Sequence, residues 1–196
     1  MSTNRVNLTL ELRSANGSTT AFYEAEKERV REALRLLAAP RLFAEPHLLL
    51  ASQQCASMIP CKGIDMILAR TSARMPLQFP LDLPAGLFDI VEQQSAWPDK
   101  SAAIEEQNGQ PRRRDSILEI HTLGGWTVRL KVVAMFHGNI QDERQFFSRL
   151  PSLPTIPFRL KDGGFGLINT GNIVRVSAWP TPEVLPKIAL PLELRR

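Results

Sequence analysis

The alternation of apolar and polar residues predicts a pair of strands at the start of the chain. Apolar side chains occupy every second position of the first run, at Val6, Leu8, Leu10 and Leu12. This period of two is the pattern of a half-buried strand. Asn16-Gly17 follows and indicates a tight hairpin turn, because both residues tolerate a positive φ. We therefore expect residues 19–23 to return as the second strand.

The period then changes to that of a helix. Apolar residues recur at i, i+3, i+4 and i+7, opposite a charged face, and they are Val30, Ala33, Leu34 and Leu37. Pro40 ends this predicted amphipathic helix. A short apolar run at residues 47–51, a polar turn at Gln53-Gln54 and a longer strand-like stretch complete the first half.

The second half repeats this order. Leu118 and Ile120 alternate with polar residues, Gly124-Gly125 make a turn, and residues 128–132 return. A second helix is predicted at residues 140–150, and Asp162-Gly163 is expected to turn a further hairpin.

Two stretches of twelve residues correspond without a gap, and we call them the repeated segments. Residues 58–69 and residues 167–178 both read as strand, polar turn with a glycine, and strand. Few residues are identical, but the apolar positions and the turn chemistry agree. The sequence therefore predicts an internal duplication: an α+β fold of two tandem ββαββ-like modules, with antiparallel sheets and one helix in each.

The predicted boundaries follow from composition. The first module with a proline-rich extended arm spans 1–95, a polar and basic linker spans 96–114, and the second module with its own arm spans 115–196. A module of about 70 residues buries little surface alone, so we expect the two to pack with pseudo-twofold symmetry. Proline removes a ladder donor, which places the arms at sheet edges or over the other module. An oligomer formed through these arms is left open.

The overall composition points to a soluble protein. Of its 196 residues 43% are hydrophobic and 22% are charged, and no apolar run has the length of a membrane span. The first residues lack the apolar core of a secretory signal, so we expect a cytoplasmic location with no membrane partner. A net charge of +4 is small for a nucleic-acid-binding domain.

The candidate chemistry is sparse. Cys55 and Cys61 are expected to be free thiols, and they are the thiol candidates for nucleophilic chemistry. Together with His47 they form the only cysteine and histidine cluster, but their spacing does not fit a zinc site, so no metal is predicted. No pattern indicates a cofactor, and no catalytic residue is assigned.

Two further features are candidates for binding. Arg112, Arg113 and Arg114 end the predicted linker and are able to contact phosphates, as are the two C-terminal arginines. Trp126 stands at a predicted hairpin tip, where an indole either caps the edge of a core or meets a partner.

The leading hypothesis is a non-enzymatic protein that binds a partner or a regulatory ligand. We expect its site in the groove between the modules, where diverged copies present unlike side chains. Two alternatives are left open. One is a nucleic-acid-binding protein that uses the arginine clusters, and the other is an enzyme that depends on Cys55 or Cys61. The sequence does not identify the partner.

Overall fold

The computed structural model describes residues 6–38, 42–51, 56–73, 87–92, 112–136 and 152–179. The described residues form an α+β fold with one α-helix and mostly antiparallel sheets. The α-helix is α1 (Lys27–Leu37), and the 3-10 turns are η1 (Leu42–Ala44), η2 (Cys61–Gly63) and η4 (Thr170–Asn172). The strands are β1 (Leu8–Ser14), β2 (Thr19–Glu24), β3 (His47–Ala51), β4 (Ala56–Pro60), β5 (Ile64–Thr71), β6 (Leu87–Glu92), β7 (Arg112–Thr122), β8 (Thr127–Phe136), β9 (Thr155–Arg159), β10 (Phe165–Asn169) and β11 (Ile173–Trp179).

The first half forms the elements that its periodicity predicts. β1 pairs with β2 across the Asn16-Gly17 turn, where Gly17 has a φ of 80°. The apolar stripe of α1 buries Val30 and Leu37 against β1 and β5, while its charged residues face solvent. The predicted strand at 47–51 is β3, and it pairs with β4.

The same pairings occur in the second half. β7 pairs with β8 as β1 pairs with β2, β11 pairs with β7 as β5 pairs with β1, and β9 pairs with β10 as β3 pairs with β4. The repeated segments also have the same local structure, strand, 3-10 turn and strand, with the turns at residues 61–63 and 170–172. The helix predicted at 140–150 lies outside the described residues and stays a prediction.

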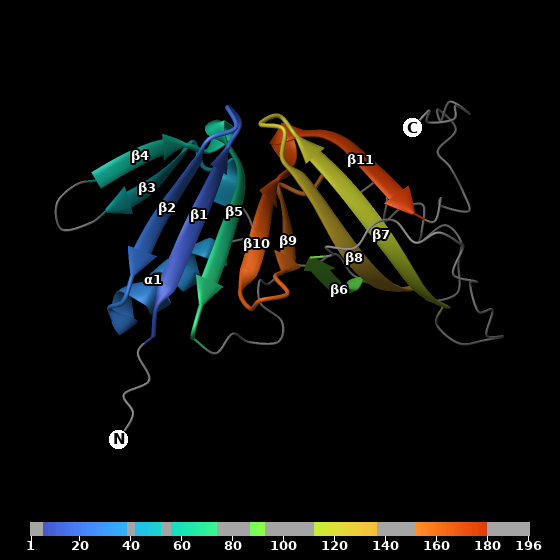
Figure 1. The fold of residues 1–196 in the computed structure, drawn as a ribbon, viewed down its shortest axis with the longest axis horizontal. Helices are drawn as coiled ribbons and strands as arrows, with labels where there is room; N and C mark the ends of the chain where they lie inside the picture. The colour runs from blue at the N-terminus through green and yellow to red at the C-terminus, as the bar shows by residue number, and fades with distance from the viewer. Residues whose placement is uncertain are drawn as a thin grey trace, which may run out of the picture.

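The two halves join where β5 pairs with β10 in the middle of the molecule (Figure 1). Alternate side chains of each strand enter the core of the other half. Met66 and Leu68 of β5 are buried in the core of the second half, which is built mainly from β7, β8, β9 and β10. Phe165 and Leu167 of β10 are buried in the core of the first half. Each core is therefore completed by the other half.

The strand pairing at this junction does not follow a twofold axis between the two halves. A twofold axis would turn the β5–β10 pair into a second pair between β4 and β11. Among the described strands, β4 pairs with β3 and β11 pairs with β7. The junction is thus heterologous, because one half contributes the strand after its 3-10 turn and the other contributes the strand before it. The expected pseudo-twofold packing is absent from the strand pairings that the structure describes.

Two predicted boundaries differ from the structure. The strand β7 begins at Arg112, so Arg112, Arg113 and Arg114 form its first residues and not the end of a linker. The start of β7 is set by its pairing with β8, in which Arg112 is opposite Phe136. The polarity of the local sequence does not reveal such a pairing.

The strand β6 was not predicted. It belongs to the segment assigned to the first module, yet it pairs with β8 and β9 of the second half. The predicted proline-rich arms at 76–84 and 182–191 lie outside the described residues. No helix among the described residues is long and apolar enough to cross a membrane, and the cytoplasmic location stays a prediction.

A buried polar network holds the tips of the two halves together. Asp65 is fully buried, and its Oδ2 accepts a hydrogen bond of 2.7 Å from the backbone N–H of Gly124. Its Oδ1 accepts one of 3.0 Å from the Asn172 side chain. The amide of Asn172 also donates to the carbonyls of Lys62 and Ile64, and Asn169 donates to those of Cys61 and Ile64. A carboxylate this deep is tolerated because each oxygen has a donor.

Gly124 gives a direct test of this contact. A Cβ at position 124 would overlap the backbone carbonyl of Ser14 and would lie 2.8 Å from Asp65 Oδ2. We expect Gly124→Ala to lower the free energy of unfolding by about 2–3 kcal/mol, because the hairpin tips would have to separate. Urea denaturation followed by circular dichroism measures this change.

The matched control is Gly63→Ala, since a Cβ there meets no atom within 4 Å. We expect Gly63→Ala to leave stability within about 0.5 kcal/mol of the wild type. Equal stability of the two variants would contradict the tight contact between the halves.

Candidate functional site

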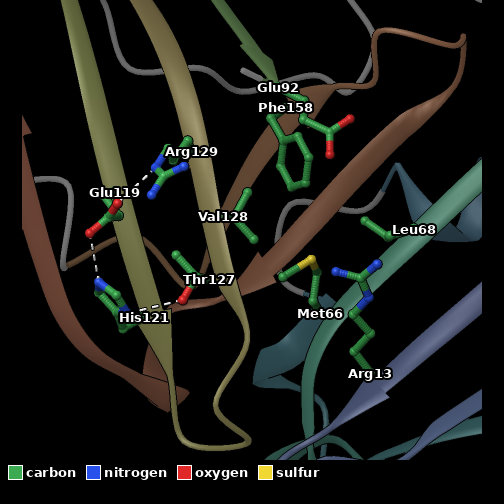
Figure 2. A pocket seen from close by; sticks show the side chains of 10 residues that line it. All are labelled: Arg13, Met66, Leu68, Glu92, Glu119, His121, Thr127, Val128, Arg129 and Phe158. Atoms are coloured by element: carbon green, nitrogen blue, oxygen red, sulfur yellow. Dashed lines mark hydrogen bonds and ion pairs between the residues drawn. The ribbon is translucent and has the colours of Figure 1, made fainter. Parts of the chain in front are cut away.

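A groove of about 460 Å³ lies at the junction of the two halves (Figure 2). Its lining combines an apolar floor with charged walls. Arg13 comes from β1, Met66 and Leu68 come from β5, and the remaining side chains come from β6 to β9, namely Glu92, Glu119, His121, Thr127, Val128, Arg129 and Phe158. The groove is therefore lined by residues from both halves.

Glu119 is the centre of one wall. It lies on β7 on the face opposite Leu118 and Ile120, and its side chain is 11% exposed. Arg129, its cross-strand neighbour on β8, donates from Nε to Glu119 Oε2 at 2.8 Å. Burial alone would raise the pKa of Glu119, but hydrogen bonds from Arg129 and His121 outweigh burial and hold that pKa below its usual range.

His121 links this carboxylate to two further side chains. Its Nε2 lies 2.9 Å from Glu119 Oε1 and 2.6 Å from a terminal nitrogen of Arg175, and its Nδ1 lies 3.1 Å from the Thr127 hydroxyl. One imidazole nitrogen cannot donate to Glu119 and accept from Arg175 at the same time. A neutral ring thus has one of two tautomers. The tautomer with the proton on Nε2 donates to Glu119, and the tautomer with the proton on Nδ1 accepts from Arg175 at Nε2.

Thr127, His121 and Glu119 have the connectivity of a hydroxyl, a base and an orienting carboxylate. Catalysis would require His121 to accept the hydroxyl proton at Nδ1, with Nε2–H turned to Glu119. Arg175 competes with Glu119 for Nε2 at 2.6 Å, and when Nε2 accepts from Arg175 the proton of the neutral ring lies on Nδ1. In that tautomer His121 donates to Thr127 and cannot act as its base.

Trp126 follows the turn between β7 and β8 and joins the two halves. Its indole Nε1–H donates to the Ser14 carbonyl at 3.1 Å, and the Arg13 guanidinium lies 5.0 Å from its ring centroid. The hydrogen-bonding group of this half-buried indole is therefore used inside the protein. The structure places Trp126 beside Arg13, which lines the groove, and its predicted role in binding stays a prediction.

The other predicted site residues are not brought into the groove. Cys61 begins η2, is 1% exposed, and lies 3.7 Å from the Leu42 carbonyl through its Sγ. Burial raises the pKa of the Cys61 thiol, and the nearby Glu45 carboxylate adds to this effect. Both disfavour the thiolate that a nucleophile needs. Cys55 and the side chains of Arg112, Arg113 and Arg114 lie outside the described residues, so the nucleic-acid hypothesis stays a prediction.

Within the described part of the chain, no group of three histidine, cysteine, aspartate or glutamate side chains is placed to hold a metal ion. His47 is exposed at the start of β3, opposite Pro60 in the ladder. Of the cysteine and histidine cluster seen in the sequence, His47 and Cys61 both lie at the open end of the β3–β4 hairpin.

Sequence reasoning missed Glu119, His121 and Arg129. In the alternating pattern they are the polar positions of two strands, which ordinarily face solvent. One signal was present, because a Glu and a His two residues apart must lie on the same face of a strand. Their partners, Arg129 and Arg175, become visible only from strand register.

Glu119 predicts a pH dependence of stability. Its folded pKa is lowered, so the stability it contributes is present above the unfolded pKa and is lost as pH falls through the folded value. We expect Glu119→Gln to lower the free energy of unfolding by about 1–3 kcal/mol at pH 7. Below about pH 5 the variant should lose less further stability than the wild type.

Urea denaturation at several pH values measures both effects. Glu28→Gln is the control, because Glu28 is paired with Arg31 on the exposed face of α1, where an ion pair adds little. An equal change for both variants at pH 7 would contradict the special position of Glu119.

The burial of Cys61 predicts that its thiol reacts slowly in the native protein. In a Cys55→Ser variant we expect the remaining thiol to resist a water-soluble disulfide reagent in the native protein and to react at once in denaturant. Absorbance of the released chromophore measures both rates. Rapid reaction of Cys61 in the native state would revive the hypothesis of a thiol-dependent enzyme.

Comparisons with protein-family models, curated proteins and solved structures found no match.

Proposed function

We propose that this chain is a non-enzymatic binding protein whose groove takes a small ligand with an apolar body and an anionic group. The observation that carries the proposal is the composition of the groove. A buried apolar floor lies between two arginine side chains, Arg13 and Arg129, which come from different halves. Binding sites for small ligands commonly combine a mainly apolar surface with a few fixed polar groups.

The floor supports the apolar part of this ligand. Met66, Leu68, Val128 and Phe158 all line the groove, and each is at most 5% exposed. These side chains belong to a packed core, so only a small part of each faces the groove, and that part is fixed and loses little conformational entropy when a ligand binds.

The two arginines support the anionic part. Arg13 donates from Nε to Glu11 at 2.7 Å, and Arg129 donates from Nε to Glu119 at 2.8 Å. These ion pairs fix each guanidinium while using Nε, and the terminal nitrogens are the ones suited to a two-pronged contact with a carboxylate, sulfonate or phosphate. Trp126 also restricts Arg13 through its ring face.

Two observations support binding over catalysis. Arg175 competes with Glu119 for His121 Nε2, and the tautomer that accepts from Arg175 has no base for Thr127. The buried Cys61 disfavours thiolate chemistry. The polar groups of the groove are thus held in place by ion pairs and hydrogen bonds within the protein, which suits recognition.

We also infer that the two halves arose by duplication of one ββαββ-like module. The 3-10 turns are separated by 109 positions, from Cys61 to Thr170, and the strands on either side pair alike in both halves. Divergence at the junction supports a separate role for each copy. Asn169 and Asn172 supply the amides that bind the first half, and Pro60 and Gly63 stand at the matching positions.

The fluorescent probe 1-anilinonaphthalene-8-sulfonate tests the groove, because it joins an aromatic body to a sulfonate. We expect it to bind the wild type and to bind Arg13→Gln about tenfold more weakly, since the anion loses a charged partner. Arg13→Lys should be intermediate, because it keeps the charge and loses the fork. Fluorescence titration at low and high salt measures these affinities.

The control is Arg31→Gln, which removes an exposed arginine of α1 that does not line the groove. Thermal denaturation checks that each variant is folded. Equal affinity of the probe for Arg13→Gln and the wild type would reject the groove as its site.

A further inference from the structure

We propose that this protein associates head to tail with further copies of itself, by pairing β4 of one copy with β11 of the next. The internal junction is the template. There β10, the strand before one 3-10 turn, pairs with β5, the strand after the other. β4 is the other strand that precedes one of these turns, and β11 is the other strand that follows one. Within the described residues, each of these two strands has a strand neighbour on one side only.

The template predicts a register. Inside the chain Phe165 is opposite Ala69, and Ile168 is opposite Met66. Applying the separation of 109 positions between the 3-10 turns to both strands gives the pairs between copies. They are Ala56 with Ala178, Ser57 with Ser177, Met58 with Val176, and Ile59 with Arg175. No proline and no pair of like charges meets in this ladder, so the two edges are compatible.

Exposure of apolar side chains marks the β3–β4 hairpin as an uncovered surface. Leu167 of β10 is 2% exposed because the first half covers it, whereas Met58, at the matching position of β4, is 66% exposed. Leu49 is directly opposite Met58 and is 64% exposed. Two large apolar side chains therefore stand together on the face that the internal junction buries.

The unpaired edge of β11 is the partner of β4 in this contact. Val174 on this strand is 64% exposed, and Val176 and Ala178 are partly buried against the second core. Arg175 and Ser177 stand where Met66 and Leu68 stand in β5, so this side is more polar than the internal junction. We therefore expect reversible association that depends on concentration.

The positions of the two edges set the kind of assembly. β4 and β11 lie at opposite ends of the long axis of the molecule (Figure 1). A contact between unlike edges is heterologous, so each added copy presents a new edge, and the series either closes into a ring or continues. This inference does not use the groove and does not depend on its ligand.

Backbone hydrogen bonding identifies variants that test the edge alone. The N–H of Cys61 donates to the Pro46 carbonyl at 3.1 Å, which directs residues 61, 59 and 57 towards β3. By alternation the backbone N–H of Met58 is directed outwards. Met58→Pro thus removes an outward donor and an exposed apolar side chain while keeping the bonds between β3 and β4.

Sedimentation velocity between ~1 and ~200 µM protein is the first test. We expect the wild type to sediment faster as concentration rises, and Met58→Pro to remain monomeric with an unchanged circular dichroism spectrum. Leu36→Lys is the control, because Leu36 is 52% exposed on α1 and lies outside both edges. A wild type that is monomeric throughout, or association that Met58→Pro leaves unchanged, would overturn the proposal.

Cross-linking tests the register without depending on a destabilising variant. Directly opposed residues in a ladder lie within the span of a disulfide. In a Cys55→Ser background, a mixture of Ser57→Cys and Ser177→Cys proteins should form a linked dimer on mild oxidation. A mixture of Ser57→Cys with Thr19→Cys, an exposed position of β2, should link far less. Equal linking in the two mixtures would overturn the predicted pairing.

Discussion

The architecture depends on the exchange of side chains across the β5–β10 ladder. Because successive residues of a strand face opposite sides, one strand is able to supply two cores at once. β5 sends Ile67 and Ala69 into the first core and Met66 into the second, and β10 divides its residues in the same way. The two halves therefore share one continuous sheet, and neither has a complete core when it is separated from the other.

The polar network next to this ladder fixes how the halves meet. Apolar burial is not directional, so it would permit the sheets to slide, whereas a buried carboxylate requires each of its donors. Asp65 meets this requirement with Gly124 and Asn172, which come from the opposite half. The same contact brings the hairpin tips together and so places Arg13 and Arg129 on the groove that both halves line. The packing of the two halves and the shape of the groove thus depend on one set of contacts.

Sequence patterns predicted the local elements better than their partners. The alternation at β1, the stripe of α1 and the repeated segments all appear as strand, helix and strand–turn–strand. The β5–β10 pair joins residues about a hundred positions apart, and no short-range pattern encodes such a contact. β6 was missed for the same reason, because its place between β8 and β9 is decided by those strands. The sequence predicted a site between the halves, and this stays a prediction. The residues it selected are not those that line the groove there, since buried Glu119 looks like an ordinary solvent-facing position.

The division of β10 between two cores has a consequence for biosynthesis. The ribosome completes β1 to β5 long before it reaches Phe165 and Leu167, the two residues of β10 that fill the first core. Until then the nascent first half holds a core with an opening, next to the unpaired edge of β5. Such a state exposes apolar surface and a strand edge, the two features that chaperones recognise and that lead to aggregation. Translation speed through residues 72–164 therefore sets how long this vulnerable intermediate exists.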